Sequence, residues 1–431
     1  MRKACNIGSR AFVSIHIGIF VNPVSCREID LVLEAPKMRR PIHLGVAVSV
    51  GVFVLLSAVT AQEEQWLQYH SANEAWQIVG DMGSSHASLK SEKPEGVHLR
   101  QFKCGEPLFA RWETPMVEAG GLYIAFDRKN EQGPYDLLYV DSDADGDLSD
   151  ESVYEPYRQD QRRTYFGPAK IIFEGEDGPI TYHINVTFYD YGDRRYLYIR
   201  PAGWYEGTVT VAGQKKHCVL IDQNVNGTFN DKSVNASQCD RIRIGKKDSR
   251  DTRFVGKYIE VEGALHELEV AQDGAYIKVT KAEDVTFGNV RLPEAITEFA
   301  AGGENGLFIL KLEKGLGKLP VGTYRIDHWA IDREDEKGRD WKLQGRYFSG
   351  DRGLFTVAET SEVELPSVGE PIISSLQARA QESRYYFSQD LQGQLGERIE
   401  LTREGARPHA PKLHIKSKDG TYDRTFSFEY G

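Results

Sequence analysis

From about residue 120 onward, short runs of apolar and aromatic residues alternate with polar turns. The runs are rich in β-branched and aromatic side chains, and Gly, Asp, Asn and Pro separate them. Examples in chain order are GLYIAF, YDLLYV, KIIF, YHINVTF, RRYLYIR, GTVTV and HCVLI. No long segment has the 3.6-residue apolar period of an amphipathic helix. The pattern therefore predicts a mainly β, multidomain protein of antiparallel β-sandwiches and disfavours a parallel α/β sheet.

Two segments have the pattern of β-hairpins, and one has the pattern of a short helix. HELEVAQDGAYIKVT and KLHIKSKDGTYDRTFSFEY each hold an Asp-Gly pair between alternating strands, and that pair suits the positive φ of a tight primed turn. Residues 62–80, QEEQWLQYHSANEAWQIVG, space their apolar side chains loosely. We expect a short N-terminal helix or two there.

Changes in the pattern divide this part of the chain into three β domains. A strand-rich block ends near residues 284–293, and ELPSVGEPI, with two prolines and a glycine, begins another set of strands. We therefore expect a first domain over 62–288, which contains two repeat units, and a second over 289–364. The C-terminal module over 365–431 is long enough for a small antiparallel sandwich.

The N-terminal residues have the pattern of a targeting segment. Residues 44–61 are uncharged and apolar, follow Met38-Arg39-Arg40 and end in small residues. This predicts a secretory signal peptide over 38–61, with a retained membrane anchor as the alternative. Because the signal begins at Met38, we interpret residues 1–37 as a mis-annotated extension and leave them out of the fold. The expected location is the periplasm, the cell surface or the extracellular space.

Charge and cysteine content fit an exported protein with a cationic or neutral ligand. The net charge is −11, and because residues 1–61 carry seven basic and three acidic residues, the remainder carries −15. Like charge repels nucleic acid and anionic lipid, so we expect neither as a partner, apart from a membrane contact through an uncleaved signal. Cys104, Cys218 and Cys239 are too few for a disulfide framework. Cys218 and Cys239 could pair across a loop, and the alternative is buried or free thiols.

Two acidic loops hold the most informative chemistry. The first, DSDADGDLSDE, runs from Asp141 to Glu151, and the second, DQNVNGTFND, runs from Asp222 to Asp231. Counted from the first Asp, both place acceptor side chains at positions 1, 3 and 5, glycine at 6 and an apolar residue at 8. Each follows a strand–turn–strand segment. We interpret the two segments as one unit used twice.

This register suits calcium, which takes six to eight oxygen ligands. Alternate residues of a tight loop turn their short side chains to one point, and the apolar residue anchors the loop in the core. The carboxylates repel one another unless a cation lies between them. Zinc would prefer His or Cys, and magnesium would retain more waters. The alternatives are a solvated acidic turn for the first loop and an Asx-stabilised structural turn for the second.

Both loops resemble the calcium loop of EF-hand proteins and, more closely, the loops of dockerins and other exported bacterial modules. They depart from it because Ser152 and Ser233 replace the last, bidentate Glu, and because a strand enters each loop. The resemblance implies ligand roles for positions 1, 3 and 5 and for the position 7 carbonyl, and position 10 is the candidate to replace the missing ligand. Because the bidentate Glu is missing, we expect weak affinity, with a dissociation constant on the order of 10⁻⁴–10⁻³ M. The expected ligands are Asp141, Asp143, Asp145, Asp147 and Asp150, and Asp222, Asn224, Asn226, Thr228 and Asp231.

The wider pattern is similar to that of a group of exported, β-rich proteins of planctomycete-type bacteria. The likeness lies in LYVD with DGDL, in GTVTVAG with LIDQNVNGTF, and in LPVGTYRI and GEPI near the C-terminus. Residues 365–431 also resemble immunoglobulin-like or carboxypeptidase-regulatory-like β modules. The resemblance implies an exported β protein and brings no activity with it.

No catalytic motif stands out, since HExxH, GxSxG, the Walker loop and the dinucleotide GxGxxG are all missing from the sequence. We therefore expect an exported calcium-binding scaffold or adhesion-type protein without catalytic activity, in which calcium stabilises the fold. One alternative is a calcium-dependent carbohydrate-binding or cell-envelope protein, with a glycan or envelope component as partner and GWYEG, FYDYGDRRYLY and RYYF as stacking aromatics. The other is a hydrolase with its active site in the first domain.

Overall fold

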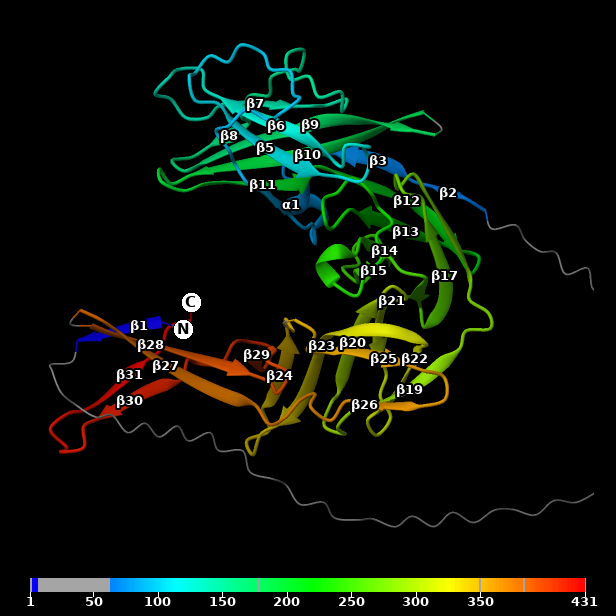
Figure 1. Ribbon diagram of the computed structural model, residues 1–431. Helices are drawn as coiled ribbons and strands as arrows, with labels where there is room; N and C mark the ends of the chain where they lie inside the picture. The colour runs from blue at the N-terminus through cyan, green and yellow to red at the C-terminus, as the bar shows by residue number, and fades with distance from the viewer. Residues whose placement is uncertain (1, 7–62, 177, 349, 383, 431) are drawn as a thin grey trace, which may run out of the picture. The chain divides into compact units, whose positions relative to one another are not determined.

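Strands dominate the computed structural model, which describes residues 2–6, 63–176, 178–348, 350–382 and 384–430 (Figure 1). Strands hold 52% and helices 2% of the chain, in several antiparallel sheets, and this confirms the predicted mainly β, sandwich-type fold. The chain forms two compact units. Of the described residues, the large unit holds 63–375 and 390–408, and the small unit holds 2–6, 376–389 and 409–430.

The predicted signal peptide and most of the predicted extension lie outside the described residues. Within the described ranges, no helix is both long enough and apolar enough to cross a membrane. Residues 2–6, which we had left out of the fold, form β1 (Arg2–Asn6) in the small unit.

Two sheets enclose the first core of the large unit. One consists of β5 (Leu108–Glu113), β6 (Gly121–Asp127) and β7 (Leu137–Val140). The other, which we call the five-stranded β10 sheet, has the order β4 (Ser85–Ala87), β11 (Arg195–Pro201), β10 (Gly178–Asp190), β9 (Arg163–Gly175) and β8 (Arg158–Gln159). Trp112, Phe126, Phe173 and Phe188 are buried in the core between them. Inward and outward side chains alternate along β11, as expected of a sheet with one face on the core.

The same core continues into two further sheets of the large unit. One has the order β15 (Arg253–Phe254), β14 (Arg241–Gly245), β13 (Gln214–Ile221), β12 (Gly203–Val211) and β3 (Gln68–Ser71). The other has the order β16 (Tyr258–Val261), β17 (Ala264–Val270), β18 (Tyr276–Lys281) and β2 (Gln65–Trp66). The antiparallel pairs β6–β7 and β12–β13 lead directly into the two acidic loops, so the predicted strand–turn–strand repeat is present.

A second core lies further along the large unit, around Phe299, Tyr324 and Trp329. Its larger sheet runs β29 (Arg398–Arg403), β24 (Asp340–Arg346), β23 (Gly322–Glu334), β20 (Glu298–Gly303) and β21 (Gly306–Leu310), with β25 (Leu354–Val357) paired to β23. Its smaller sheet is β22 (Leu316–Pro320), β19 (Phe287–Arg291) and β26 (Glu362–Glu364), in which β19 and β26 are parallel.

The C-terminal residues do not form one separate module. Residues 390–408 group with the large unit, because β29 pairs with β24 and buries Ile399 in the second core. The expected module 365–431 is therefore divided. The small unit contains β1, β27 (Ile373–Gln381), β28 (Arg384–Gln392), β30 (Lys412–Lys416) and β31 (Asp423–Ser427), where β27 starts and β28 ends in residues of the large unit. Its core is small and centres on Phe387, Leu413, Ile415 and Phe428.

Both predicted hairpins form, as β17–β18 and β30–β31, but their turns are wider than the tight primed turn that we expected. In each turn only the glycine has a positive φ, 82° at Gly274 and 74° at Gly420, whereas a primed turn of this type needs two such residues. The amide of Ala271 donates to the carbonyl of Tyr276 at 3.0 Å, so four residues lie in the first loop. An Asp carboxylate closes both turns from within.

The predicted N-terminal helix forms only as α1 (Ala75–Val79). The residues before it are β2 and β3, because each completes the edge of a sheet. Trp66 lies opposite Tyr276 of β18, with 5.4 Å between their ring centroids, and Tyr69 lies opposite Tyr205 of β12 at 5.1 Å. Cross-strand packing thus outweighs the loose helical spacing of the sequence. A short 3-10 helix, η1 (Ala236–Gln238), is the other helical element among the described residues.

Candidate metal centre

The backbones of the two acidic loops follow the same course. Position 4 has a positive φ in both, 68° at Ala144 and 60° at Val225, and so does position 6, 79° at Gly146 and 92° at Gly227. A positive φ is uncommon for a residue other than glycine and unusual for a β-branched one. The shared conformation therefore comes from the side chains that organise the loops.

The acceptor side chains at positions 1 and 5 bind amides of their own loop. Position 1 accepts from the amide of position 6, and position 5 accepts from the amide of position 7. The bonds are Gly146 N to Asp141 Oδ1 (3.4 Å) and Asp147 N to Asp145 Oδ1 (2.7 Å), and Gly227 N to Asp222 Oδ2 (2.8 Å) and Thr228 N to Asn226 Oδ1 (2.9 Å). Position 8 is buried in both loops, as Leu148 and Phe229. The predicted register is thus a shared three-dimensional unit.

Three carboxylates of the first loop converge. Asp141, Asp143 and Asp145 each offer one oxygen, and these oxygens all lie within 4.8 Å of one another. Asp141 is buried and the other two are exposed. Burial raises the pKa of Asp141, and the negative charges of Asp145 and Asp143 raise it further. A cation among the three oxygens would remove this repulsion.

Glu151 fixes the first loop from its far end. Its carboxylate accepts hydrogen bonds from the amide of Ser142 and, at 2.8 Å, from the Ser142 hydroxyl. It is buried, and burial raises its pKa, with the charges of Asp143 and Asp141 adding to the effect. The carbonyl of Ser142 accepts in turn from the amide of Ile172 in β9 at 2.7 Å. The loop is therefore attached to the edge of the β10 sheet.

A backbone bridge to His98 holds the middle of the first loop. The amide of His98 donates to the carbonyl of Gly146 at 3.0 Å, and the amide of Leu148 donates to the carbonyl of His98 at 2.9 Å. The bridge leaves out the carbonyl of Asp147, the group that we expected to face the ion. Leu148 packs with Phe109, Leu137 and other side chains on the outer face of the β5–β7 sheet.

The carboxylates of Asp147 and Asp150 lie outside the group of three. Asp147 Oδ1 accepts from the amide of Ser149 at 2.7 Å, and hydrogen bonds from Ser149 hold the pKa of Asp147 below its usual range. Asp147 Oδ2 lies 3.6 Å from His98 Nδ1. Asp150 is exposed, and the buried acid at this end of the loop is its neighbour Glu151.

In the second loop the same inward positions converge on a carboxylate of the loop itself. Asp231 Oδ2 accepts hydrogen bonds from Asn224 Nδ2 (3.1 Å), Asn226 Nδ2 (2.8 Å) and Thr228 Oγ1 (2.6 Å). Asn226 Oδ1 accepts from the amide of Thr228 at 2.9 Å and lies 2.8 Å from the Thr228 hydroxyl oxygen. A cation here would need both amides to turn their oxygens inward, and turning Asn226 would break two of these bonds. With the side chains arranged in this way, the groups that face the centre of the second loop do not fit a metal ion. Asn224 Oδ1 is nevertheless buried without a hydrogen-bond partner.

Two further buried carboxylates complete the second loop. Asp222 accepts from the hydroxyl of Tyr182 at 2.7 Å and from the amide of Val225 at 2.6 Å, and burial raises its pKa to about 6. Asp240 accepts from the amides of Gln223 and Asp231, at 3.0 and 2.8 Å. Burial raises the pKa of Asp240 well above its usual value, and the charges of Asp222 and Asp231 add to this.

Sequence reasoning missed Glu151 and Asp240. Glu151 belongs to the acidic run, but it stands one residue before the place where an EF-hand has its Glu, so the comparison with that loop passed over it. Asp240 lies outside the loop and has no spacing signal.

Cys218 and Cys239, which could have paired, are free and buried, as is Cys104.

The first loop fits a hard divalent cation. Two oxygens that bind one ion lie no farther apart than twice the metal–oxygen distance, about 5 Å for calcium, and the three carboxylates meet this condition. The donors are all oxygens, which suits calcium or magnesium and does not suit zinc. Calcium, the ion that tolerates irregular geometry, fits the flexible exposed side chains of Asp143 and Asp145 better than magnesium does.

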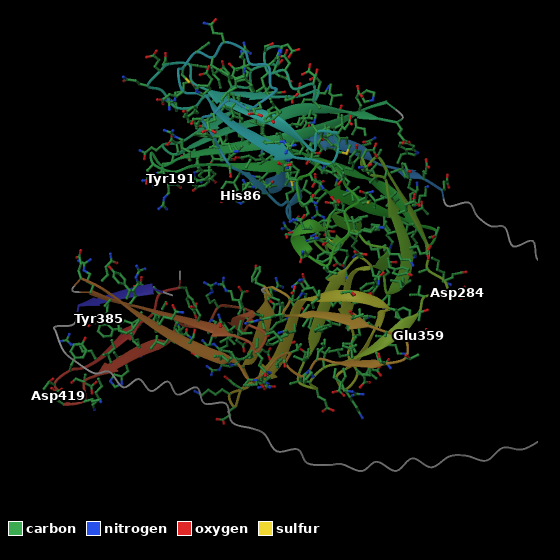
Figure 2. All side chains as sticks on the ribbon, viewed as in Figure 1. His86, Tyr191, Asp284, Glu359, Tyr385 and Asp419 are labelled. Atoms are coloured by element: carbon green, nitrogen blue, oxygen red, sulfur yellow. The ribbon has the colours of Figure 1, made fainter. Side chains whose placement is uncertain are left out.

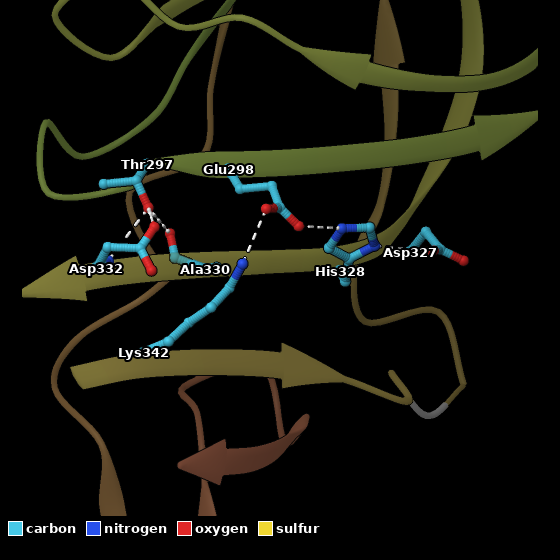
Figure 3. Close-up of polar contacts among 7 residues, drawn as sticks. All are labelled: Thr297, Glu298, Asp327, His328, Ala330, Asp332 and Lys342. Atoms are coloured by element: carbon cyan, nitrogen blue, oxygen red, sulfur yellow. Dashed lines mark hydrogen bonds and ion pairs between the residues drawn. The ribbon is translucent and has the colours of Figure 1, made fainter. Parts of the chain in front are cut away.

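A histidine network in the second core is the strongest catalytic-like arrangement among the described residues (Figure 3). His328 Nδ1 lies 2.8 Å from Asp327 Oδ2, and His328 Nε2 lies 2.8 Å from Glu298 Oε1. Lys342 Nζ donates to the other oxygen of Glu298 at 2.9 Å. Both ring nitrogens are therefore engaged by carboxylates, and no hydroxyl or thiol lies within hydrogen-bond distance of His328 in the described structure. The arrangement is that of a structural ion network.

The large unit also has a pocket of about 710 Å³, which we compared with the requirements of a hydrolase site. Arg325, Arg346, Asp327 and Asp351 supply its charged lining, and no described histidine lines it. Its lining holds the Ser237 hydroxyl but no histidine that could act as the general base for it.

A comparison of the chain with protein-family models, with curated proteins and with solved structures finds no match.

Proposed function

We propose that the chain is an exported calcium-binding scaffold protein, in which one calcium ion at the first loop stabilises the large unit. The observation that carries the proposal is the convergence of Asp141, Asp143 and Asp145 in a loop whose two ends are joined through Glu151 and whose first end is tied to β9. Bound calcium would join the β5–β7 sheet to the edge of β9. The three carboxylates supply ligands, Glu151 positions the loop, and the Asp147 carbonyl and water complete the coordination.

The second loop is a structural copy that needs no metal. Asp231 stands at its centre and accepts hydrogen bonds from three inward-facing donors. Of the two alternatives left open by its sequence, the Asx-stabilised turn is the one that these hydrogen bonds favour. We therefore expect one calcium ion per chain.

The test is thermal unfolding of the full chain in EDTA and in about 10 mM calcium. With a dissociation constant on the order of 10⁻⁴–10⁻³ M, that concentration adds about 1.4–2.7 kcal/mol to the free energy of unfolding. We expect the melting temperature to rise by a few degrees, and magnesium at the same concentration to give a smaller rise. Isothermal titration calorimetry should give a stoichiometry near one.

The decisive variant is Asp143→Asn with Asp145→Asn, which keeps the shape of two exposed side chains and removes their charges. It should lose the response to calcium and, in EDTA, be at least as stable as the wild type, because two repelling charges are gone. The matched control, Glu118→Gln with Glu131→Gln, removes two exposed charges away from the loop and should respond like the wild type. Equal melting curves for the wild type in calcium and EDTA would contradict the proposal.

A further inference from the structure

The outward face of the five-stranded β10 sheet, around Tyr189, Tyr196 and Tyr198, is covered with aromatic and basic side chains; we call it the tyrosine–arginine face. Directly opposed residues of antiparallel strands lie side by side on one face. One row crosses all five strands as His86, Tyr198, Thr187, Tyr165 and Arg158, and a second holds Tyr196, Tyr189 and Arg163. Strands lie about 4.8 Å apart, so the first row is about 19 Å long. His86 and Tyr191 mark this side of the sheet, which is turned away from β5–β7 (Figure 2).

The tyrosine rings of this face pack against one another. Tyr189 and Tyr196 are stacked, with centroids 4.7 Å apart and 14° between the ring planes, and Tyr191 stacks on Tyr196 at 5.8 Å and 13°. Because the rings cover one another's faces, the stack presents phenol hydroxyl groups rather than open ring faces to a ligand.

Guanidinium groups border the stacked rings. The Arg162 guanidinium lies 5.1 Å from the ring centre of Tyr191, and the Arg200 guanidinium lies 5.8 Å from that of Tyr198. Arg158 and Arg163 of the same face have carboxylate partners, whereas Arg162 and Arg200 have none within ion-pair distance in the described part of the chain. In a chain of net charge −11, this face therefore carries an excess of positive charge.

The chemistry of this face selects an anionic, extended ligand. Guanidinium groups bind carboxylate and sulfate through paired N–H donors, and phenol hydroxyls add donors and acceptors that match sugar hydroxyls. A nucleic acid fits less well, because base stacking needs open ring faces and because the dense phosphate charge meets an acidic protein. We propose that the tyrosine–arginine face binds an acidic polysaccharide, a sugar chain that carries carboxylate or sulfate groups.

This site is independent of the proposed calcium site. The converging carboxylates follow β7, in the other sheet of the sandwich, and the side chains of the tyrosine–arginine face point away from the core between the two sheets. Polysaccharide binding should therefore persist in EDTA, and loss of the calcium response should leave it intact.

The test is binding of the full chain to polygalacturonate, which carries carboxylates, and to dextran sulfate, with neutral dextran and single-stranded DNA as comparisons. Calorimetry at low salt should detect binding to at least one of the acidic polysaccharides and none to dextran. Arg162→Ala with Arg200→Ala should weaken that binding at least tenfold. Tyr191→Phe with Tyr196→Phe, which keeps the rings and removes two hydroxyls, should weaken it severalfold. Their melting temperatures should match that of the wild type.

The control variant, Lys246→Ala with Lys247→Ala, removes two exposed positive charges from the turn that follows β14 and should bind normally. An equal loss in the control would show attraction by overall charge and would overturn the assignment of the face. The assignment would also fall if neither acidic polysaccharide bound, if single-stranded DNA bound more tightly, or if the arginine variant bound like the wild type.

Discussion

Glu151 holds the shape of the first loop, the proposed calcium site. Its carboxylate holds both the amide and the hydroxyl of Ser142, which stands between two of the converging carboxylates. Glu151→Ala would leave these two donors unpaired, at a cost of about 1–3 kcal/mol to the free energy of unfolding. Groups that orient metal ligands typically contribute 10–100-fold to affinity. We therefore expect calcium affinity, measured by calorimetry, to fall by at least tenfold.

Asp150 provides the matched comparison for Glu151. It is the adjacent acid in the same loop, but its side chain is exposed. Asp150→Ala should change calcium affinity less than threefold and leave stability in EDTA unchanged. If Asp150→Ala weakened calcium binding as much as Glu151→Ala, Asp150 would be the replacement ligand that its spacing had predicted.

Asp222 should make stability depend on pH. Burial raises its folded-state pKa to about 6 from an ordinary value of 3.8, with Asp231, Asp240 and Tyr182 close to it. Proton binding therefore favours the folded state, and the contribution is fully present below about pH 4 and lost as the pH rises through about 6. The unfolding free energy of the wild type minus that of Asp222→Asn should fall over this range by roughly 3 kcal/mol, because a tenfold change in proton affinity corresponds to about 1.4 kcal/mol.

The measurement is urea unfolding of the wild type and Asp222→Asn in EDTA at several values between pH 4 and pH 7. Taking the difference between the two proteins cancels the titration of groups far from Asp222. A difference that stays level or grows with pH would contradict the folded-state pKa that we assign to this carboxyl group.

At the scale of elements, the two loops share one backbone conformation but differ in the side-chain groups that they bring together. Both have positive φ at positions 4 and 6, and both bury position 8. The first gathers charges that oppose one another, and the second gathers donors around Asp231. Charge at positions 3 and 5 separates the two outcomes, since Asp can only accept hydrogen bonds when ionised whereas Asn also donates.

Asp231→Ala tests the second loop. It would leave Asn224, Asn226 and Thr228 without their shared acceptor, and we expect the free energy of unfolding to fall by about 1–3 kcal/mol or more. The rise in melting temperature caused by calcium should stay the same, because the proposed calcium site is in the first loop. The exposed Asp248→Ala is the control and should be neutral. A lost calcium response in Asp231→Ala would instead make the second loop a metal site.

Local patterns predicted much of the fold and of the site. Asp-Gly pairs located both hairpins, and the shared register of the loops predicted the convergence of Asp141, Asp143 and Asp145. The closure of the second loop by its own Asp231 was not predictable, because spacing does not tell whether an amide turns its oxygen or its nitrogen inward. The segment FYDYGDRRYLY pointed to the tyrosines of the tyrosine–arginine face, but the rest of the face was hidden, because it assembles strands that lie up to about a hundred residues apart.

At the scale of the whole molecule, the two units differ in the size of their cores. The small unit buries only a few large side chains, around Leu413 and Ile415, whereas the large unit has two extensive cores. All six tryptophans lie between residues 66 and 341, within the large unit, so tryptophan fluorescence reports on that unit alone. We expect hydrogen exchange to be faster in β30 and β31 than in β10, because few buried contacts protect them.

Leu413→Ala should therefore unfold the small unit without disturbing the large one. Such a substitution in a core costs about 2–5 kcal/mol, which is enough to open a unit of this size. The melting curve followed by tryptophan fluorescence should be unchanged, whereas exchange in β30 and β31 should accelerate. The matched variant Leu138→Ala, in the first core, should lower the fluorescence transition. A fluorescence transition that fell equally in both variants would show that the units unfold together.

The strand β29 sets a limit on how this protein can be cut or recombined. The chain passes from the small unit to the large unit after Gln389, where β29 pairs with β24, and it returns to the small unit at His409. Just before β29, the Glu397 carboxylate accepts from the Trp329 indole nitrogen at 2.9 Å. A chain ending at Ser375 would lose this strand, leave the indole without its acceptor and open the edge of β24 to pairing with other molecules. The C-terminal segment therefore cannot be moved to another protein as an independent domain, because part of it completes a sheet of the large unit.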